Sequence, residues 1–239
     1  MTKRSFLLLL SALLVQLCIG VLSFVTYNGQ QGFLFPLLIR IFVLFPLLIP
    51  AAAAFRDTRS AYSGCILAAL CLSAAGDSCI TLGAAIGGAV CFFFVHALNA
   101  GNFVSLFYRQ GGSLGWKEVL SGLVFFTAGF FVYSGFFYRN LLSDRPMLVL
   151  VLVYAVVLSY ALWKAFLLYS AGGATFWLAV FSGELLFYFT DIQVAYSELV
   201  LHHPTNEWVN NMIYYTGLFL LSVSALLEKE ELLSPSAGQ

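Results

Sequence analysis

The sequence predicts an all-α membrane protein, a bundle of eight transmembrane helices with both termini in the cytoplasm. Three observations support this fold class. Hydrophobic residues make up 61% of the 239 residues and charged residues only 9%, whereas soluble domains carry about 25% charged residues. Apolar runs of about 20 residues, each long enough to cross a hydrocarbon core of about 30 Å as a helix, recur along the chain. Most lysine and arginine residues fall on one side of the resulting topology.

The predicted helices follow these apolar runs in order. They cover residues 5–27, 33–54, 60–82, 83–107, 117–138, 146–169, 174–199 and 207–227. The first run, which follows Lys3 and Arg4, could instead be a signal peptide, but no small-x-small cleavage site comes after it, so we expect a retained helix. Residues 1–227 are therefore predicted to form one transmembrane domain, followed by a polar C-terminal tail at 228–239.

The orientation of the bundle follows from the positions of its basic residues. Those at or near one side are Lys3, Arg4, Arg56, Arg59, Arg109, Lys117, Lys164 and Lys229, whereas Arg139 and Arg145 lie near the other. The positive-inside rule puts the more basic side, and with it both termini, in the cytoplasm. An even number of helices requires both termini on one side as well. A bacterial cytoplasmic membrane and an endoplasmic reticulum fit this charge bias equally.

Composition and spacing exclude several classes of function. The five cysteines all fall in apolar segments without a CxxC pair, which indicates buried apolar residues, neither a disulfide framework nor a metal site. Zinc chemistry needs about three well-spaced ligands, and the predicted helices contain a single histidine. The net charge is zero, with no basic tract for nucleic acid and no phosphate-binding glycine motif. We therefore expect no metal, no cofactor and no nucleic-acid partner.

Two aspartates inside the apolar runs are the strongest functional signal. Asp77 and Asp191 each lie within a predicted transmembrane helix. A carboxylate in hydrocarbon costs several kcal/mol, so a chain that keeps two usually pairs them, hydrates them or uses them chemically. A single intramembrane aspartate is as often a structural hydrogen-bonding group as a functional one, but two at a common depth favour function.

Depth can be estimated from the predicted helix ends at about 1.5 Å per residue. Arg40, Asp77, Asp191 and Tyr214 then share one polar layer at roughly 8–12 Å from the non-cytoplasmic side. Arg40 either neutralises an aspartate or binds a phosphate through its planar donor fork.

A second polar layer lies deeper, at roughly 20–22 Å. It holds His96 and Glu184, and Glu184 is two helical turns from Asp191 and so projects from nearly the same face. His96 is either an interhelical hydrogen-bonding group or a catalyst. Together the two layers predict a cavity lined by Asp77, Asp191, Arg40, Tyr214 and Tyr215, with His96, Asn99 and Glu184 as its floor.

Two carboxyl groups in one layer are suited to general acid–base catalysis, one protonated and the other ionised. A vinyl ether is a lipid bond matched to that chemistry. Protonation of its β-carbon generates an oxocarbenium ion at the α-carbon, water adds, and the hemiacetal collapses to an aldehyde and an alcohol. The ionised carboxylate would stabilise the cation and accept a proton from the attacking water.

Four blocks of sequence carry a family resemblance. These blocks are 73–79 (SAAGDSC), 89–103 (AVCFFFVHALNAGNF), 185–191 (LLFYFTD) and 213–226 (IYYTGLFLLSVSAL). In this order they resemble the lysoplasmalogenase family of membrane proteins, also called YhhN-type. The resemblance implies a polytopic hydrolase that cleaves the vinyl ether of lysoplasmalogens, releasing a fatty aldehyde and glycerophosphocholine or glycerophosphoethanolamine. Its implied partners are this lysophospholipid substrate and the surrounding membrane lipid.

The family's two motif aspartates fall on Asp77 and Asp191, and its motif histidine on His96. The chain departs from the pattern at Glu184, where the family more often has Ala, and at Thr190, where it often has Ser. A lysine expected ahead of Pro46 has no direct counterpart, and Arg40 lies about one turn earlier. These departures bear on substrate preference more than on fold.

The resemblance suggests a placement of the substrate in the predicted cavity. The hydrocarbon chain would lie between helices, the vinyl ether at the Asp77 and Asp191 layer, and the phosphate near Arg40. Aromatic side chains, including Trp208 and the Tyr214–Tyr215 pair, could contact a choline or ethanolamine cation.

An alternative function belongs to a different class. In a proton-coupled transporter or a lipid-binding membrane protein, Asp77, Glu184, His96 and Asp191 would form a proton relay. Against the transporter, the sequence shows neither an inverted repeat nor the paired broken helices typical of that class. In a purely structural bundle, neutralising either aspartate would instead raise stability.

Overall fold

The computed structural model describes residues 10, 14, 21, 34–172, 175–201 and 207–233, and only the backbone of 34–43, 207–208 and 229–233. Every regular element in this part of the chain is a helix, which confirms the all-α class there. In chain order they are α2 (Leu34–Thr58), α3 (Ala61–Thr81), α4 (Ala85–Arg109), α5 (Trp116–Val132), η1 (Tyr133–Tyr138), α6 (Arg145–Gly172), α7 (Thr175–Tyr196), η2 (Ser197–Leu201) and α8 (Glu207–Leu233).

These helices agree with seven of the eight predicted ones. The first predicted helix, 5–27, falls almost entirely outside the described residues, so the count of eight and the side of the termini stay predictions. The predicted helices 117–138 and 174–199 each end in a π-helical segment, η1 and η2 respectively. Helix α8 continues to Leu233, past its predicted end at 227, because Glu, Lys and Leu there all favour helix.

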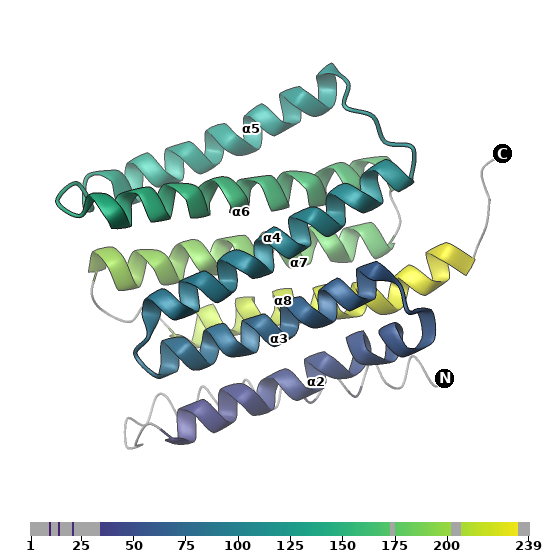
Figure 1. Cartoon of the computed structure of the whole chain (residues 1–239), viewed down its shortest axis with the longest axis horizontal. Coiled ribbons are helices and arrows are strands. Elements are labelled where there is room, and N and C mark those ends of the chain that lie inside the picture. Colours follow the sequence, from purple (N-terminus) through teal and green to yellow (C-terminus); the bar gives the residue numbers. More distant parts are fainter. Residues whose placement is uncertain are drawn as a thin grey trace.

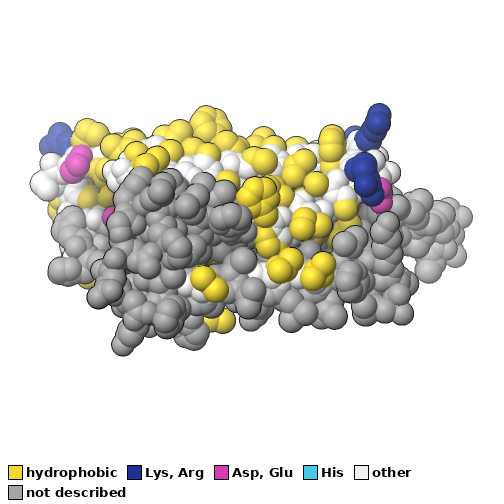
Figure 2. Space-filling model, turned by 90° about the horizontal axis from the view of Figure 1, so that it is seen from below, with side chains coloured by type: hydrophobic (Ala, Val, Ile, Leu, Met, Phe, Trp, Pro, Cys, Tyr) yellow, Lys and Arg dark blue, Asp and Glu magenta, His cyan; other side chains and the backbone are white. Residues whose placement is uncertain are grey.

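Six segments of the described chain are long and apolar enough to cross a membrane, which supports an integral membrane protein. They are Ala61–Thr81, Ala85–Arg109, Trp116–Tyr138, Arg145–Gly172, Thr175–Leu201 and Val209–Glu228. Large hydrophobic side chains on them face outward, and Trp116 and Phe131 are 72% and 67% exposed. Figure 2 shows hydrophobic side chains along one flank, with lysine and arginine side chains at the two ends. This distribution suits a flank in contact with lipid.

The helices run along the long axis of the bundle, with α5 beside α6 at one edge and α2 at the opposite edge (Figure 1). Helix α4 packs against α3 and α6, α7 against α6 and α8, and α8 against α2 and α3. The α3–α4 and α5–α6 connections lie at the same end, on the left of Figure 1. The end of α3, the beginnings of α4, α6 and α8 and the end of α7 therefore share that end of the bundle.

Two glycines allow α7 and α8 to approach closely in the centre of the bundle. A Cβ added to Gly183 would lie 3.0 Å from the carbonyl oxygen of Gly217, and a Cβ added to Gly217 would lie 3.0 Å from that of Gly183. Small residues at such a crossing let helix backbones meet in a membrane. The contact fixes the helix that carries Asp191 against the helix that carries Tyr214.

Candidate active site

Asp77 lies near the end of α3, with 5% of its surface exposed. Its Oδ2 accepts hydrogen bonds from the hydroxyl groups of Tyr214, at 3.2 Å, and of Tyr215, at 3.5 Å. Both tyrosines belong to α8, and the ring of Phe92 on α4 packs edge-on against that of Tyr214. Three helices thus fix the position of this carboxyl group, and the structure brings together the predicted residues Asp77, Tyr214 and Tyr215.

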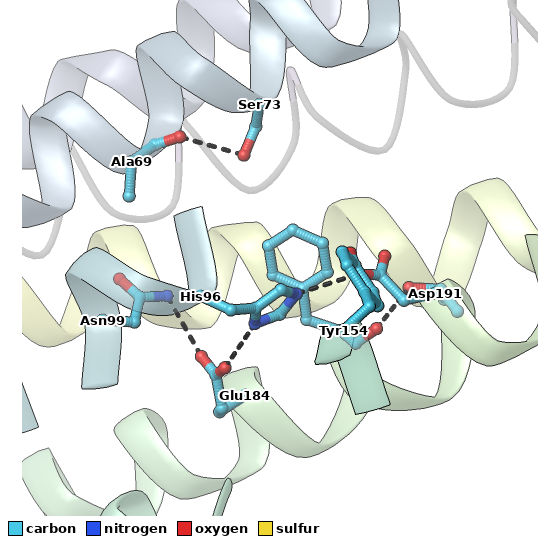
Figure 3. Close-up of polar contacts among 9 residues, drawn as sticks. Ala69, Ser73, His96, Asn99, Tyr154, Glu184 and Asp191 are labelled. Carbon is cyan, nitrogen blue, oxygen red and sulfur yellow. Dashed lines mark hydrogen bonds and ion pairs between the residues drawn. The ribbon is translucent and has the colours of Figure 1, made fainter. Parts of the chain in front are cut away.

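His96 on α4 bridges two carboxylates of α7. Its Nδ1 lies 2.8 Å from Oε1 of Glu184, and its Nε2 lies 2.9 Å from Oδ2 of Asp191. Figure 3 shows the ring between the two carboxyl groups. The arrangement follows from the sequence spacing, because residues seven apart project from nearly the same face of a helix. His96 and Glu184 are fully buried.

The row of polar groups continues beyond Glu184 in one direction and beyond Asp191 in the other. Asn99, one turn after His96 on α4, donates from Nδ2 to Oε2 of Glu184 at 3.1 Å. At the other end the hydroxyl of Tyr154 on α6 donates to Oδ2 of Asp191. Asn99, Glu184, His96, Asp191 and Tyr154 therefore form one hydrogen-bonded row across α4, α6 and α7 (Figure 3).

The chemistry of this row constrains its protons. Ionised carboxylates only accept hydrogen bonds, so an ionised Glu184 and an ionised Asp191 require a proton on both ring nitrogens of His96. If His96 is neutral, one of the two carboxyl groups must carry a proton and donate it to the ring. In either state the row stores a proton next to Asp191.

A pocket opens at the shared end of α3, α4, α6, α7 and α8. Hydrophobic side chains, among them Ile86, Ala89 and Leu150, form much of its wall. Polar residues also line it: Asp77, Tyr154, Thr190, Asp191, Ser197, Glu198, Asn210, Asn211 and Tyr214. A pocket with an apolar wall and a few convergent polar groups is typical of a small-molecule or lipid site.

The predicted cavity differs from this pocket in its floor and at Tyr215, which donates to Asp77 but is not among the residues that line the pocket. Asp77, Asp191 and Tyr214 line the pocket, but His96, Asn99 and Glu184 are buried to 0% exposure and lie behind Asp191 in the row. The side chains of Arg40 and Trp208 lie outside the described residues. In the part of the chain that the structure describes, no group of three His, Cys, Asp or Glu side chains could hold a metal ion.

Sequence reasoning did not single out Tyr154, Asn210 or Asn211. Tyr154 lies about nine residues into its predicted helix, a depth close to the Asp77 layer, but other tyrosines, including Tyr169, occupy the same helix. Asn210 and Asn211 fall in the first turns of the last predicted helix, where polar residues at the membrane surface are ordinary.

Comparisons with known proteins point to one family. The family model described as the YhhN family matches residues 30–225. Among curated proteins, mouse (Mus musculus) "Lysoplasmalogenase TMEM86B" is 29% identical over 159 residues, a match that covers 66% of this chain and 62% of the relative. The matched region thus spans less than two thirds of that relative. No solved structure matches the chain.

Proposed function

The chain belongs to the YhhN family, and from this premise we propose that it is a lysoplasmalogenase. It hydrolyses the vinyl ether of a lysoplasmalogen, releasing a fatty aldehyde and a glycerophospho-alcohol. One observation carries the proposal: two aspartates from different transmembrane helices, Asp77 and Asp191, line one pocket whose wall is largely hydrophobic. The curated relative named a lysoplasmalogenase supports the same reaction.

The pocket suits a lipid with one reactive polar bond. Its apolar wall on α4 and α6, which includes Ile86, Ala89 and Leu150, can hold an alkenyl chain. The carboxyl groups of Asp77 and Asp191 belong to residues that line the same pocket. A lipid can enter such a pocket from the membrane with its chain along the wall and its ether oxygen at the carboxyl groups.

In the proposed mechanism Asp77 is the acid and Asp191 the anion. Asp77 protonates the β-carbon of the vinyl ether, and the positive charge appears on the α-carbon and the ether oxygen. Asp191 stabilises this cation and takes a proton from the water that attacks the α-carbon. The proton of the hemiacetal hydroxyl then passes to the glycerol oxygen as the bond between that oxygen and the α-carbon breaks, so an aldehyde and an alcohol leave. A proton returns from Asp191 to Asp77 before the next turnover.

The hydrogen bonds support this division of roles. Asp191 has two close partners, the Tyr154 hydroxyl, which donates to it, and the Nε2 of His96. With a proton on Nε2, both donate to Asp191 and stabilise an ionised carboxylate. The tyrosine hydroxyls at Asp77 lie further away, at 3.2 and 3.5 Å, which is more compatible with a carboxyl group that keeps its proton. Glu184 and Asn99 act through His96, as positioning residues behind Asp191.

The test is aldehyde release by the purified protein in lipid nanodiscs. We expect the wild type to cleave a lysoplasmalogen but not its saturated-ether analogue, which has no double bond to protonate. Asp77→Asn and Asp191→Asn should each lower the rate by about 10²- to 10⁴-fold, the usual contribution of acid–base catalysis. Asp57→Asn is the matched control, because Asp57 is exposed near the end of α2. Activity retained in both active-site variants would exclude the mechanism.

The buried row of hydrogen-bonded side chains favours a second candidate function, proton-coupled transport. His96 between Glu184 and Asp191 could pass protons in a proton-coupled transporter. Proteoliposomes separate the two functions, since a transporter would move protons with its substrate without consuming any lysoplasmalogen. Aldehyde release without proton flux supports the hydrolase.

A further inference from the structure

Two buried side chains on the pocket wall have polar atoms without a partner. Asn210 and Asn211, in the first turns of α8, line the pocket and are 9% and 7% exposed. Within the described part of the chain, Oδ1 of Asn210 and Nδ2 of Asn211 have no hydrogen-bond partner. Buried polar atoms in proteins are nearly always hydrogen-bonded, to protein or to ordered water, so neighbouring orphan groups on one pocket indicate that a ligand or an ordered water completes them.

The position of the two amides relates them to the proposed reaction. Asn210 is four residues before Tyr214, so it lies on the same face of α8 about one turn earlier, about 6 Å along the axis. Tyr214 donates to Asp77. The neighbouring hydroxyls of Thr190 and Ser197 already donate to backbone oxygens of α7. Asn210 and Asn211 thus line the same pocket as the carboxyl groups, and neither of these hydroxyls satisfies their amides.

The two orphan atoms differ in hydrogen-bonding character, which narrows the ligand group. Oδ1 of Asn210 needs a donor, and Nδ2 of Asn211 needs an acceptor. A phosphate only accepts, and a quaternary ammonium has no N–H to donate. A primary ammonium only donates. A hydroxyl group both donates and accepts, and alone among these groups it satisfies both amides.

We propose that Asn210 and Asn211 form a subsite for the free 2-hydroxyl of the glycerol in a lysoplasmalogen. The inference rests on the proposed function, because it places the glycerol beside the vinyl ether that Asp77 and Asp191 cleave. In this lipid the 2-hydroxyl stands on the carbon next to the one that carries the vinyl ether, which suits a subsite one helical turn from Tyr214.

The subsite accounts for a preference for lysolipids over lipids with two chains. In a 2-acyl lipid an ester replaces the hydroxyl, so nothing donates to Oδ1 of Asn210, and the second chain must also fit. Sites built to hydrogen-bond a hydroxyl reject analogues that lack it, since buried polar groups are then left unpaired.

The experiment measures binding, so it does not depend on catalysis. Three saturated-ether phospholipids that differ only at carbon 2 (hydroxyl, hydrogen or acyl ester) are titrated against the full-length wild type in nanodiscs. We expect the 2-deoxy lipid to bind about tenfold more weakly than the hydroxyl lipid, the effect of one lost hydrogen bond with a buried partner. The 2-acyl lipid should bind more weakly still. Equal binding of the hydroxyl and deoxy lipids, or no binding of any of them, would overturn the subsite.

Variants of the two asparagines test whether these side chains cause the preference for the hydroxyl lipid. Asn210→Leu and Asn211→Leu should each lower affinity for the hydroxyl lipid about tenfold and remove its advantage over the deoxy lipid. Asn140→Leu is the matched control, because Asn140 is exposed and its Nδ2 donates to the Phe136 carbonyl oxygen. If the variants do not fold, the binding of the three lipids to the wild type still tests the subsite.

The same samples separate this inference from the proposed function. A wild type that binds the hydroxyl lipid selectively but releases no aldehyde from lysoplasmalogen contradicts the lysoplasmalogenase proposal and retains the subsite. A wild type that cleaves lysoplasmalogen and its 2-deoxy analogue at equal rates retains the enzyme and overturns the subsite.

Discussion

Nε2 of His96 lies 2.9 Å from Oδ2 of Asp191, so a pocket carboxylate on α7 is fixed from behind by a side chain of α4. The opposite ring nitrogen contacts Glu184 at 2.8 Å. His96 is thus the residue through which the buried part of the row acts on the pocket.

Replacing His96 tests that relationship. His96→Ala leaves the carboxyl groups of Glu184 and Asp191 buried without the ring between them. We expect the free energy of unfolding to fall by about 1–3 kcal/mol for each buried carboxyl group left without its hydrogen-bond partner. Thermal unfolding in detergent measures this loss. An unchanged melting temperature would show that the ring does not hold the two helices.

Glu184 distinguishes positioning from catalysis. Glu184→Gln keeps a carbonyl oxygen that can accept from Nδ1 of His96, and its amide nitrogen can donate to Oδ1 of Asn99, which lacks a partner in the described structure, once the Asn99 amide turns. We therefore expect most of the activity to remain. Glu184→Ala removes the partner of both His96 and Asn99 and should cost about 1–3 kcal/mol in unfolding free energy, with a larger drop in kcat than in substrate affinity. Equal activity in the two variants would contradict a positioning role.

Three polar residues of the pocket could be predicted by counting helical residues from the ends of the apolar runs. That count predicted one layer for Asp77, Asp191 and Tyr214, and all three line one pocket. It could not predict Tyr154, because apolar helices carry many tyrosines and helix rotation decides which one faces inward. The π-helical ends of α5 and α7 could not be predicted from the sequence either, because the spacing of apolar residues does not reveal one extra residue per turn.

Tyr154 is a further test of the Asp191 environment. Tyr154→Phe removes the hydroxyl that donates to Asp191 and keeps the ring that packs edge-on against His96. We expect kcat to fall about tenfold, with little change in KM, because one hydrogen bond to an ionised group is lost. Tyr169→Phe on the same helix, whose ring stacks on Phe181, is the control and should retain full activity.

The two tyrosines that donate to Asp77 lie at different distances from it, so their phenylalanine variants should differ in effect. The Tyr214 hydroxyl is 3.2 Å from Oδ2 and the Tyr215 hydroxyl 3.5 Å, and hydrogen bonds weaken as they lengthen. Tyr214→Phe should therefore reduce aldehyde release by about tenfold, and Tyr215→Phe by less. A larger effect at Tyr215 would contradict the proposed geometry around Asp77.

The close crossing of α7 and α8 makes the site sensitive to a methyl group far from the pocket. Gly183→Ala would place a Cβ 3.0 Å from the Gly217 carbonyl oxygen and 2.9 Å from Cγ of Leu221, so the helices must separate. We expect a loss of about 1–3 kcal/mol of unfolding free energy, typical of overpacking, together with lower activity because Asp191 shifts relative to Asp77.

Gly101→Ala on α4 is the matched control, since a Cβ there meets nothing within 4 Å. Alanine should stabilise that helix by up to about 1 kcal/mol. A lower melting temperature for Gly183→Ala and a higher one for Gly101→Ala would show that the loss at Gly183 comes from the helix crossing, because intrinsic helix propensity favours alanine at both positions.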